Sequence, residues 1–264
     1  MSSQPIPALS VVIMTYNEES NLPRCLESVQ GIGDEIFILD SFSTDRTVDI
    51  GQQANARVEQ HAFGSYVDQK KRLVEKALHD WVLCIDADEY LSEELKQSIL
   101  QAKASNVFDG YFNNRRNKIG PHWIRYGSWY PDRKIRLFDR RKVRIMGQDP
   151  HDVMEPDKDA RIGYLKGDLM HIADEDLAAR IQKIKQHSTR AAEALFAKGV
   201  KSNLYRRFIK PPARFISSYL LRLGFLDGYY GWFVAKSEAQ YVWMREAKLK
   251  AKAKAGEGRI TNNE

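Results

Sequence analysis

Hydrophobic residues gather in short continuous runs along the first hundred residues. Leu9 to Met14, Glu35 to Leu39 and Trp81 to Ile85 are rich in apolar and β-branched side chains, which predicts three buried strands. Helical spacing of apolar residues predicts helices between these strands, over residues 21–29, 44–55 and 66–79. Because alternating strands and helices are typical of βαβ units, we expect an α/β fold with a largely parallel sheet.

The remainder of the chain is less regular. Residues 108–172 contain short strand-like pieces such as 134–138 and 162–165, so the sheet is expected to be mixed. Asp174 is a candidate cap for a long helix that ends at Gly199, and Pro211-Pro212 then interrupts the chain. We therefore predict one α/β domain over residues 1–200 and a helical extension over residues 201–264.

Composition places the chain among ordinary globular proteins. It has 264 residues, of which 43% are hydrophobic and 29% charged, and these proportions exclude a low-complexity or fibrous protein. Its two cysteines, Cys25 and Cys84, lie inside apolar segments. This placement favours buried thiols in a reducing compartment, the cytosol, over a disulfide framework.

Positive charge is concentrated at the C-terminal end. Residues 198–264 carry 14 basic and 5 acidic side chains, and aromatic residues alternate with the basic ones over residues 205–250. Such a segment suits an amphipathic helix on an anionic membrane surface, and the alternative is an ordinary helical subdomain packed on the sheet. Nucleic acid is disfavoured as a partner, because no nucleic-acid-binding motif accompanies the charge.

The sequence contains no pattern of a secretory signal or of a membrane-spanning helix. The N-terminus lacks a basic segment followed by a long apolar one. Arg214, Arg222 and Asp227 interrupt the most apolar stretch of the C-terminal segment. We expect a cytoplasmic protein that associates peripherally with the inner face of a membrane.

Polar residues follow each predicted strand of the first hundred residues. They are Thr15 to Glu19, Asp40 to Asp45 and Asp86 to Glu89. Ligands of parallel α/β sheets bind in the crevice beyond the carboxyl ends of the strands. The sequence therefore predicts a ligand site formed by three acidic loops.

Asp86 and Asp88 form an Asp-x-Asp pair directly after a buried strand. If the chain stays extended there, both carboxylates point to the same side and suit a hard divalent cation, Mg²⁺ or Mn²⁺. Two further Asp-x-Asp pairs, at 157–159 and 174–176, are interpreted as a polar turn and a helix N-terminus. Only the pair at 86–88 follows a strand.

These motifs resemble those of a known family. The segments VVIMTYNEESNLPRCLESV, EIFILDSFSTDRTVDI and DWVLCIDADEYLSEEL resemble family 2 of the inverting glycosyltransferases over residues 9–100. The resemblance implies the nucleotide-binding GT-A fold, a mixed but mainly parallel sheet flanked by helices. Softer patterns resemble one branch, the bacterial glucosyltransferases of lipopolysaccharide inner-core synthesis; they are YPDRKIRLFDRR, His151-Asp152, His171 and GFLDGYYGW.

The resemblance implies roles for individual residues in binding a nucleotide-diphosphate sugar. Thr15, Tyr16, Asn17 and Glu18 would cradle the base and ribose, and Asp40 would accept from a pyrimidine N–H, which favours uridine. Asp86 would meet the ribose or the metal, Asp88 the metal, and Lys70 the diphosphate. The alternative for Lys70 is a solvated helix face, and that for Tyr16 is a core aromatic. Phe42 and Arg46 depart from the family, which commonly has glycine at both positions.

Inverting transfer also needs a base beside the acceptor, on the face opposite the leaving group. Asp152 is our candidate, although the family branch has Glu at this position, and Glu155 is the alternative. His171 completes the metal shell or contacts the diphosphate, unless it is a satisfied core histidine. Trp123, Trp129 and Tyr130 offer faces on which an acceptor sugar would stack, unless they are buried in the core.

The leading hypothesis is a metal-dependent inverting hexosyltransferase. It would transfer glucose from UDP-glucose to a heptose of the lipid-anchored inner core. One alternative changes the acceptor to a polyprenyl-linked or other cell-envelope glycan. A sugar nucleotidyltransferase would want a glycine-rich phosphate loop after the first strand, which TYNEES lacks. The last alternative is a non-catalytic sugar-nucleotide or membrane-binding protein.

Overall fold

The chain folds into two compact units. The computed structural model describes residues 6–105, 107–148 and 151–260, with the side chains of 148, 151–152 and 255–260 outside the description. Of the described residues, those up to 115 and those of 132–171 form the first unit, and those of 116–131 and from 172 onward form the second. The predicted division after residue 200 stays a prediction. None of the described helices is long and apolar enough to cross a membrane.

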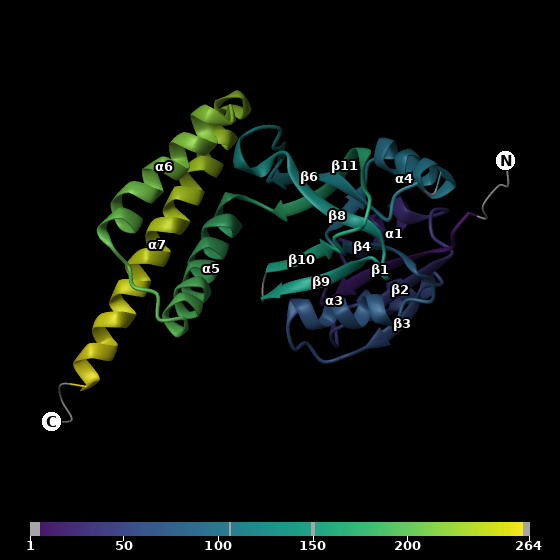
Figure 1. Ribbon diagram of the computed structural model, residues 1–264, viewed down its shortest axis with the longest axis horizontal. Coiled ribbons are helices and arrows are strands. Elements are labelled where there is room, and N and C mark those ends of the chain that lie inside the picture. The colour runs from purple at the N-terminus through teal and green to yellow at the C-terminus, as the bar shows by residue number, and fades with distance from the viewer. Residues whose placement is uncertain (1–5, 106, 149–150, 261–264) are drawn as a thin grey trace. The chain divides into compact units, whose positions relative to one another are not determined.

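A mixed sheet carries the first unit (Figure 1). The strand order is β3-β2-β1-β4-β8-β6-β11-β5, with β7 paired to β6. Strands β3, β2, β1 and β4 run parallel, whereas β8 is antiparallel to both β4 and β6. The strands are β1 (Leu9–Thr15), β2 (Glu35–Asp40), β3 (Arg57–Gln60), β4 (Trp81–Asp86), β5 (Glu89–Leu91), β6 (Gly110–Ile119), β7 (His122–Trp123), β8 (Asp132–Asp139) and β11 (Ile162–Asp174).

Alternating side chains of the parallel strands fill two cores. Val11 of β1 and Leu83 of β4 belong to the core on one face of the sheet, and their neighbours Val12 and Val82 belong to the core on the other. Figure 1 shows α1 and α3 on opposite sides of the sheet, as these two cores require. The helices are α1 (Leu22–Val29), α2 (Thr47–Gln53), α3 (Tyr66–Glu75) and α4 (Glu93–Ser105); a hairpin of β9 (Val143–Gln148) and β10 (His151–Pro156) joins the α3 side.

The predicted α/β fold with helices flanking a mixed sheet is confirmed, with two local corrections. Helix α2 begins at Thr47 and not near Thr44, because the preceding residues join the loop after β1. Asp176, not Asp174, caps the long helix: its carboxylate accepts a hydrogen bond from the amide of Ala179 at 2.7 Å. The Asp157–Asp159 segment is a turn, as predicted.

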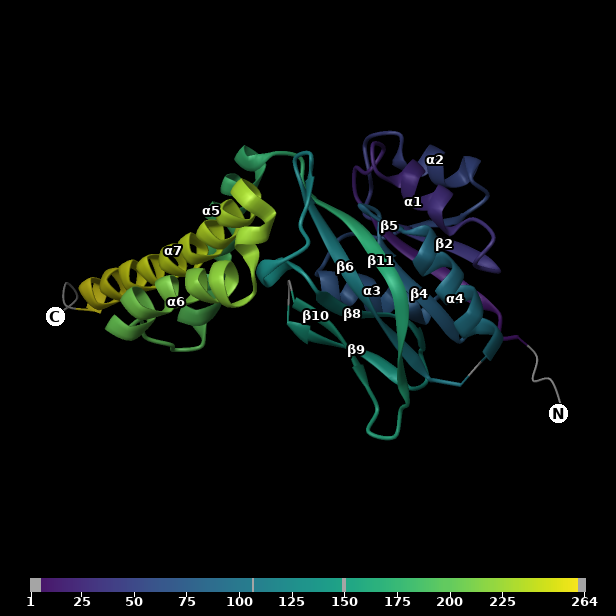
Figure 2. The same ribbon diagram turned by 90° about the horizontal axis from the view of Figure 1, so that it is seen from above.

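The second unit is helical apart from short segments. Helix α7 lies between α5 and α6 in both views (Figures 1 and 2). The helices of the second unit are α5 (Leu177–Ala197), α6 (Lys210–Ile216) and α7 (Gly228–Ile260). Its shorter helical turns are η1 (Gly127–Trp129), η2 (Tyr205–Ile209), η3 (Ser217–Leu221) and η4 (Gly224–Asp227). Pro211-Pro212 does not interrupt the chain as expected, because both prolines lie in the first turn of α6. Amide groups of a first turn have no hydrogen-bond acceptor within the helix, so proline loses nothing there.

The GFLDGYYGW segment has a structural role in this unit. The buried carboxylate of Asp227 accepts hydrogen bonds from the amides of Arg125 and Tyr126, at 2.9 and 2.8 Å. A Cβ atom added to Gly231 would lie 1.8 Å from the carbonyl oxygen of Gly224, so the two backbones touch. This motif therefore folds the turn before α7 against the hairpin of residues 119–126.

Candidate active site

The three acidic loops meet at one edge of the sheet. In the register of the parallel strands, Thr15 lies beside Asp40 and Met14 lies beside Asp86. All three strands end within one residue of this line, so the loops that follow them leave the sheet together. The convergence predicted from the sequence is confirmed.

Asp40 ties the first two loops to each other. Its side chain is fully buried and accepts hydrogen bonds from Thr15 Oγ1 at 2.9 Å, the Ser43 amide at 2.8 Å and Gln60 Nε2 at 3.2 Å. Buried carboxylates require such partners, since burying a carboxylate without them costs about several kcal/mol. The Asp40 contacts fix the relative position of the loops at residues 15–19 and 41–47.

Cross-loop hydrogen bonds continue along the loop after β1. The amide of Asn17 donates to Ser43 Oγ at 2.8 Å, and the Asn17 carboxamide oxygen accepts from the Thr44 amide at 2.8 Å. Asn17 has φ = 54°, a conformation that asparagine tolerates better than most residues. The amide of Glu18 donates to Thr47 Oγ1 at 2.7 Å.

Two aromatic side chains at these loops face solvent. Tyr16 is 59% exposed and Phe42 is 54% exposed, so the alternative of a core role for Tyr16 is wrong. Phe42 has φ = 61°, in the left-handed region that favours glycine. The backbone therefore explains why glycine would suit this position, whereas Arg46 has an ordinary φ of −80°.

Asp86 is held by two buried cations. Lys70 Nζ of α3 lies 3.0 Å from Oδ1, and Arg136 Nη2 of β8 donates to Oδ2 at 3.0 Å. Burial disfavours the charged carboxylate, but the positive charges of Lys70 and Arg136 outweigh it and hold the pKa of Asp86 well below its usual range. Lys70 is only 3% exposed, so its alternative assignment to a solvated helix face is wrong.

Arg136 extends this ion pair into a buried network that the sequence analysis missed. Arg136 also donates to Glu89 Oε1 at 2.8 Å, and the side chain of Glu89 is fully buried. Arg115 connects Glu89 to Asp132, at 3.3 and 2.7 Å. The signal was present in the sequence: Arg136 stands between Ile135 and Leu137 in an apolar strand, where a charge needs a partner.

Asp88 does not lie in an extended segment. Strand β4 ends at Asp86, and residues 87 and 88 form a turn before β5, so the expected extended geometry of the Asp-x-Asp pair is wrong. Asp88 instead meets His171 of β11, with 3.2 Å between Oδ2 and Nε2. Antiparallel pairing of β5 with β11 sets His171 beside Glu89 and so brings the imidazole to Asp88.

The loops share a negative electrostatic field. Burial raises the pKa of Glu18, and the charges of Asp88, Asp45 and Asp86 raise it further, although a hydrogen bond from Asn21 opposes the shift. Burial is the largest cause of the raised pKa of Glu18, and the three neighbouring carboxylates add repulsion to it. A cation would relieve this repulsion.

The residues present fit a divalent cation whose coordination shell is completed by other oxygen ligands. Within the described residues, no three acidic, histidine or cysteine side chains are grouped to hold a metal by themselves. Asp88 and His171 supply a carboxylate and an imidazole at one point. Mg²⁺ typically binds through one or two carboxylates together with substrate phosphates and water, so two protein ligands suffice.

The two candidate bases lie on β10. Asp152 is in this strand opposite Gly147, but its side chain lies outside the described residues. Glu155 lies opposite Arg144 and is exposed. The choice between them stays a prediction.

Cations cover the three aromatic rings proposed for stacking an acceptor sugar. Lys118 lies 5.6 Å from the centre of the Trp123 ring, Arg180 lies 4.6 Å from that of Trp129, and Arg116 lies 5.2 Å from that of Tyr130. All three rings are half-buried. Each has a cation–π partner, which stabilises it within its own unit.

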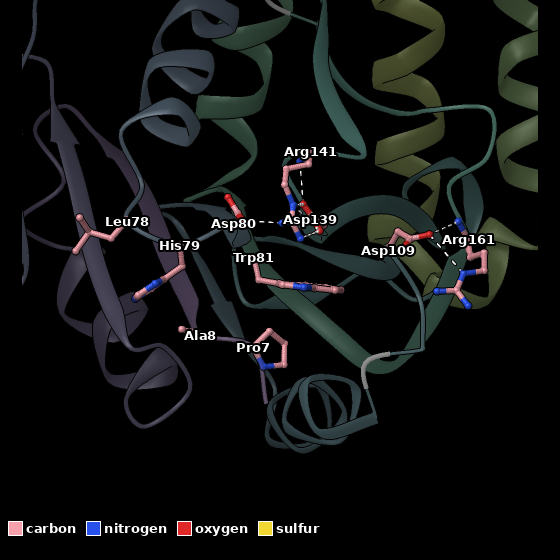
Figure 3. A pocket seen from close by; sticks show the side chains of 10 residues that line it. All are labelled: Pro7, Ala8, Leu78, His79, Asp80, Trp81, Asp109, Asp139, Arg141 and Arg161. Atoms are coloured by element: carbon pink, nitrogen blue, oxygen red, sulfur yellow. Dashed lines mark hydrogen bonds and ion pairs between the residues drawn. The ribbon is translucent and has the colours of Figure 1, made fainter. Parts of the chain in front are cut away.

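A cavity of about 520 Å³ opens at the other end of the parallel strands (Figure 3). Its lining includes Pro7 and Ala8 just before β1, and Asp80 and Trp81 at the start of β4. In Figure 3, Arg141 reaches toward Asp80 and Asp139, and Arg161 pairs with Asp109. The amino ends of β1 and β4 lie here, so this cavity is separate from the acidic loops.

Comparison with known proteins identifies the family. The model of the family described as "Glycosyl transferase family 2" matches residues 10–156. An uncharacterised glycosyltransferase of Rickettsia typhi is 29% identical, covering 92% of this chain and 86% of the relative. The lipopolysaccharide core biosynthesis glycosyltransferase LpsC of Rhizobium meliloti is also 29% identical, covering 91% of each chain.

Solved structures give weaker likenesses. TarS of S. aureus in complex with UDP-GlcNAc is 14% identical, with a TM-score of 0.45 over 91% of each chain. At that score it says nothing about what this chain binds. The family match spans more than half of the sequence, from β1 through the Asp86–Asp88 loop to the end of β10. On that match, this chain is a member of glycosyl transferase family 2.

Proposed function

We propose that the enzyme transfers a hexose with inversion, in a metal-dependent reaction, from a nucleotide-diphosphate donor to a lipid-anchored glycan. The observation that carries this proposal is the meeting of three acidic loops at one sheet edge, with Asp88 beside His171. Such an edge suits a diphosphate that arrives with a divalent cation. The donor is glucose bound to uridine diphosphate, as the resemblance of the loop motifs implies.

The loop after β1 and the loop after β2 form the nucleotide site in this proposal. Thr15, Tyr16, Asn17 and Glu18 contact the base and ribose, and Asp40 accepts from the pyrimidine. Exposed Tyr16 offers a ring face to the base. Because Asp40 is already bonded within the protein, its contact with the base requires one loop hydrogen bond to be exchanged.

Asp88 and His171 would hold the metal, Mg²⁺ or Mn²⁺, and Asp86 would meet the ribose or the metal. When bound, the cation would supply positive charge against the negative charge of the departing diphosphate. Lys70 and Arg136 keep Asp86 ionised and fixed in place. Lys70 also adds positive charge near the diphosphate, which favours departure of the nucleotide.

Transfer is a single displacement at the anomeric carbon. A carboxylate, Asp152 or alternatively Glu155, accepts the proton of the acceptor hydroxyl as its oxygen bonds to that carbon. The bond from the carbon to the diphosphate oxygen breaks on the opposite face. The products are the glycosylated acceptor and the nucleoside diphosphate, and the carboxyl group holds the proton until it passes to solvent.

The acceptor in this proposal is a heptose of the lipopolysaccharide inner core. The relative LpsC, named for lipopolysaccharide core biosynthesis, supports this class of acceptor. The enzyme would act at the cytoplasmic face of the inner membrane, with its C-terminal segment against anionic lipid. A polyprenyl-linked glycan is the second candidate acceptor, and the core glycan isolated from a deletion strain distinguishes the two.

Release of uridine diphosphate tests the proposed function. The purified enzyme is incubated with UDP-glucose, Mn²⁺ and deacylated inner-core oligosaccharide, and the nucleotide product is quantified. We expect turnover that a chelator abolishes and that Asp88→Ala lowers by at least about 100-fold. Turnover that is unchanged in the chelator contradicts the metal role, and absence of turnover with every nucleotide sugar contradicts the proposal.

A further inference from the structure

The segment from residue 198 to residue 226 has only one sign of charge. It contains seven basic residues and no Asp or Glu. They are Lys198, Lys201, Arg206, Arg207, Lys210, Arg214 and Arg222. Arg206 and Arg214 pair with Glu246 and Glu238 of α7, and the charge of the other five attracts a partner of the opposite sign.

The same segment exposes large apolar side chains. Ten of them lie between residues 204 and 226, and Leu204 and Leu221 are 72% and 76% exposed. The others are Tyr205, Phe208, Ile209, Ile216, Leu220, Leu223, Phe225 and Leu226. Single exposed apolar residues are ordinary, but ten of them within 23 residues of the chain mark an interaction surface. We call these ten side chains, with the basic residues among them, the basic apolar face.

The buried side of this segment is small or polar, which reverses the usual pattern of a surface helix. Its buried residues are Pro211, Ser218 and Gly224. Ser218 donates to or accepts from Ser128 at 2.9 Å, and Gly224 contacts Gly231. An ordinary surface helix turns its apolar side inward. Here the large apolar side chains point outward although an inward packing surface on α7 exists.

The turn between η3 and η4 is the most apolar part of the face. Five of its seven residues from Leu220 to Leu226 are exposed leucine or phenylalanine. Leu223 has φ = 58°, a backbone conformation that is costly for a residue with a branched side chain. Its side chain stays 46% exposed in spite of this cost. The backbone thus holds a leucine out into solvent at the tip of the turn.

Helix α7 contributes less to this surface than the sequence pattern suggests. Tyr230, Trp232 and Phe233 are half-buried, because α7 lies between α5 and α6 (Figures 1 and 2). Tyr229 and Trp243 are its exposed large apolar residues within the described part of the helix. The apolar surface of the second unit is therefore concentrated before α7.

Charge selects the partner of the basic apolar face. Arg206 and Arg214 pair with Glu246 and Glu238 of α7, but a second copy of the chain in a symmetric dimer would still set the other five basic residues against their counterparts around the apolar contact. An anionic bilayer offers phosphates to the Arg and Lys side chains and an acyl boundary to the leucines and aromatic rings. The combination of exposed leucine, aromatic residues and cations, in a segment that has no acidic residue of its own, matches the bilayer.

We infer that residues 204–226, and not α7, dock the enzyme on an anionic phospholipid bilayer, with the turn from Leu220 to Leu226 inserted deepest. This inference rests on the proposed function only for its purpose, which is to bring the enzyme to a lipid-anchored acceptor. The binding itself needs neither donor nor acceptor. It is therefore measured separately from sugar transfer.

Vesicle co-sedimentation of the full chain tests the inference. The vesicles contain either phosphatidylcholine alone or equal parts of phosphatidylcholine and phosphatidylglycerol. We expect binding to the mixed vesicles that falls as salt rises. Leu220→Gln with Leu221→Gln should lower the partition coefficient by about 100-fold, and Lys210→Gln with Arg222→Gln by about tenfold.

Matched controls use equally exposed residues of the first unit. Leu78 is 67% exposed, and Lys158 and Lys166 are exposed as well. Leu78→Gln and the pair Lys158→Gln with Lys166→Gln should leave vesicle binding unchanged. Circular dichroism confirms that each variant folds. If the leucine pair binds vesicles as well as the wild type, or if Trp243→Gln alone abolishes binding, the assignment to residues 204–226 is overturned.

Two further measurements distinguish bilayer docking from self-association and from nucleotide binding. Analytical ultracentrifugation without lipid would reveal a dimer that the leucine pair dissociates, and that result overturns the inference in favour of self-association. Nucleotide binding by the same samples reports on the proposed function. Failure to bind vesicles with nucleotide binding intact overturns docking alone, whereas loss of nucleotide binding with docking intact contradicts the proposed function alone.

Discussion

Asp88 and His171 meet side chain to side chain, with 3.2 Å between Oδ2 and Nε2, although 83 residues separate them. Strand β5 brings them together, since its antiparallel pairing with β11 aligns Glu89 with His171. A carboxylate and an imidazole at one point of a negative site suit a divalent cation. The pair therefore supports a test of metal binding that does not depend on turnover.

Removing either partner of this pair should weaken Mn²⁺ binding. We expect Asp88→Asn to raise the dissociation constant of Mn²⁺, measured by calorimetry with uridine diphosphate present, by at least about tenfold, and His171→Gln by less. Asp176→Asn is the matched control, because that carboxylate caps α5. It should leave Mn²⁺ binding unchanged. Equal Mn²⁺ affinity in Asp88→Asn and wild type would remove Asp88 from the metal site.

The buried network around Arg136 should matter for stability as well as for the site. Arg136→Met leaves the carboxylates of Asp86 and Glu89 without their shared cation, and breaking a buried pair costs about 3–5 kcal/mol. Arg136→Lys should lose less, since it keeps the charge but not the planar fork. Urea unfolding measures both. Arg133→Met, on the same strand but exposed, is the control and should change stability by less than about 1 kcal/mol.

Sequence reasoning reached the sheet and the loops because their signals are local. The apolar runs of β1, β2 and β4 and the polar residues after them are continuous in the chain, and parallel register then brings the loops together. Arg136, which pairs with Asp86, was not reached in this way, and His171, which meets Asp88, was singled out only among the patterns that carry the family resemblance. Arg136 and His171 come from antiparallel strands, whose register depends on pairing across long sequence separations.

The geometry at Asp88 shows a second limit. The Asp-x-Asp spacing predicts one shared direction only if the chain stays extended, and the turn at residues 87–88 removes that condition.

In the C-terminal segment, composition identified charge and aromatic residues but not which of them face outward. Packing of α7 between α5 and α6 decides that, because it buries rings that periodicity alone leaves on an open face.

The general base can be identified by comparing two carboxylates on β10. We expect Asp152→Asn to lower kcat by about 10²–10⁴-fold with little change in the KM for UDP-glucose, because a base acts in the transition state. Glu155→Gln should retain most of the activity. If the two variants show the reverse pattern, Glu155 is the base, and if both stay active, neither carboxylate accepts the proton.

Close backbone contact in the second unit makes Gly231 sensitive to any side chain. An added Cβ would lie 1.8 Å from the carbonyl oxygen of Gly224, so α7 and η4 would have to separate. We expect Gly231→Ala to destabilise the protein by at least about 2 kcal/mol, in line with severe overpacking. Gly199→Ala is a less severe comparison, because nothing lies near its Cβ position. Thermal unfolding followed by circular dichroism measures both variants.

The pH dependence of stability should reveal how much the ionised form of Glu35 contributes to the free energy of unfolding. This carboxylate lies far from the proposed chemistry. Burial raises its pKa, but hydrogen bonds from Ser10 and the Leu78 amide and the Arg57 guanidinium outweigh burial and lower it. A lowered pKa stabilises the fold above the unfolded-state value, about 4.3, and this contribution is lost as pH falls through the folded-state pKa. We therefore expect Glu35→Gln to reduce the free energy of unfolding by about 1–3 kcal/mol at pH 7, with a difference from wild type that shrinks in acid. Glu27 is exposed, so Glu27→Gln should show no such pH dependence. Urea unfolding down to about pH 3 measures the free energy of unfolding of each variant. If Glu35→Gln is less stable than wild type by the same amount at every pH, ionisation of Glu35 does not stabilise the fold.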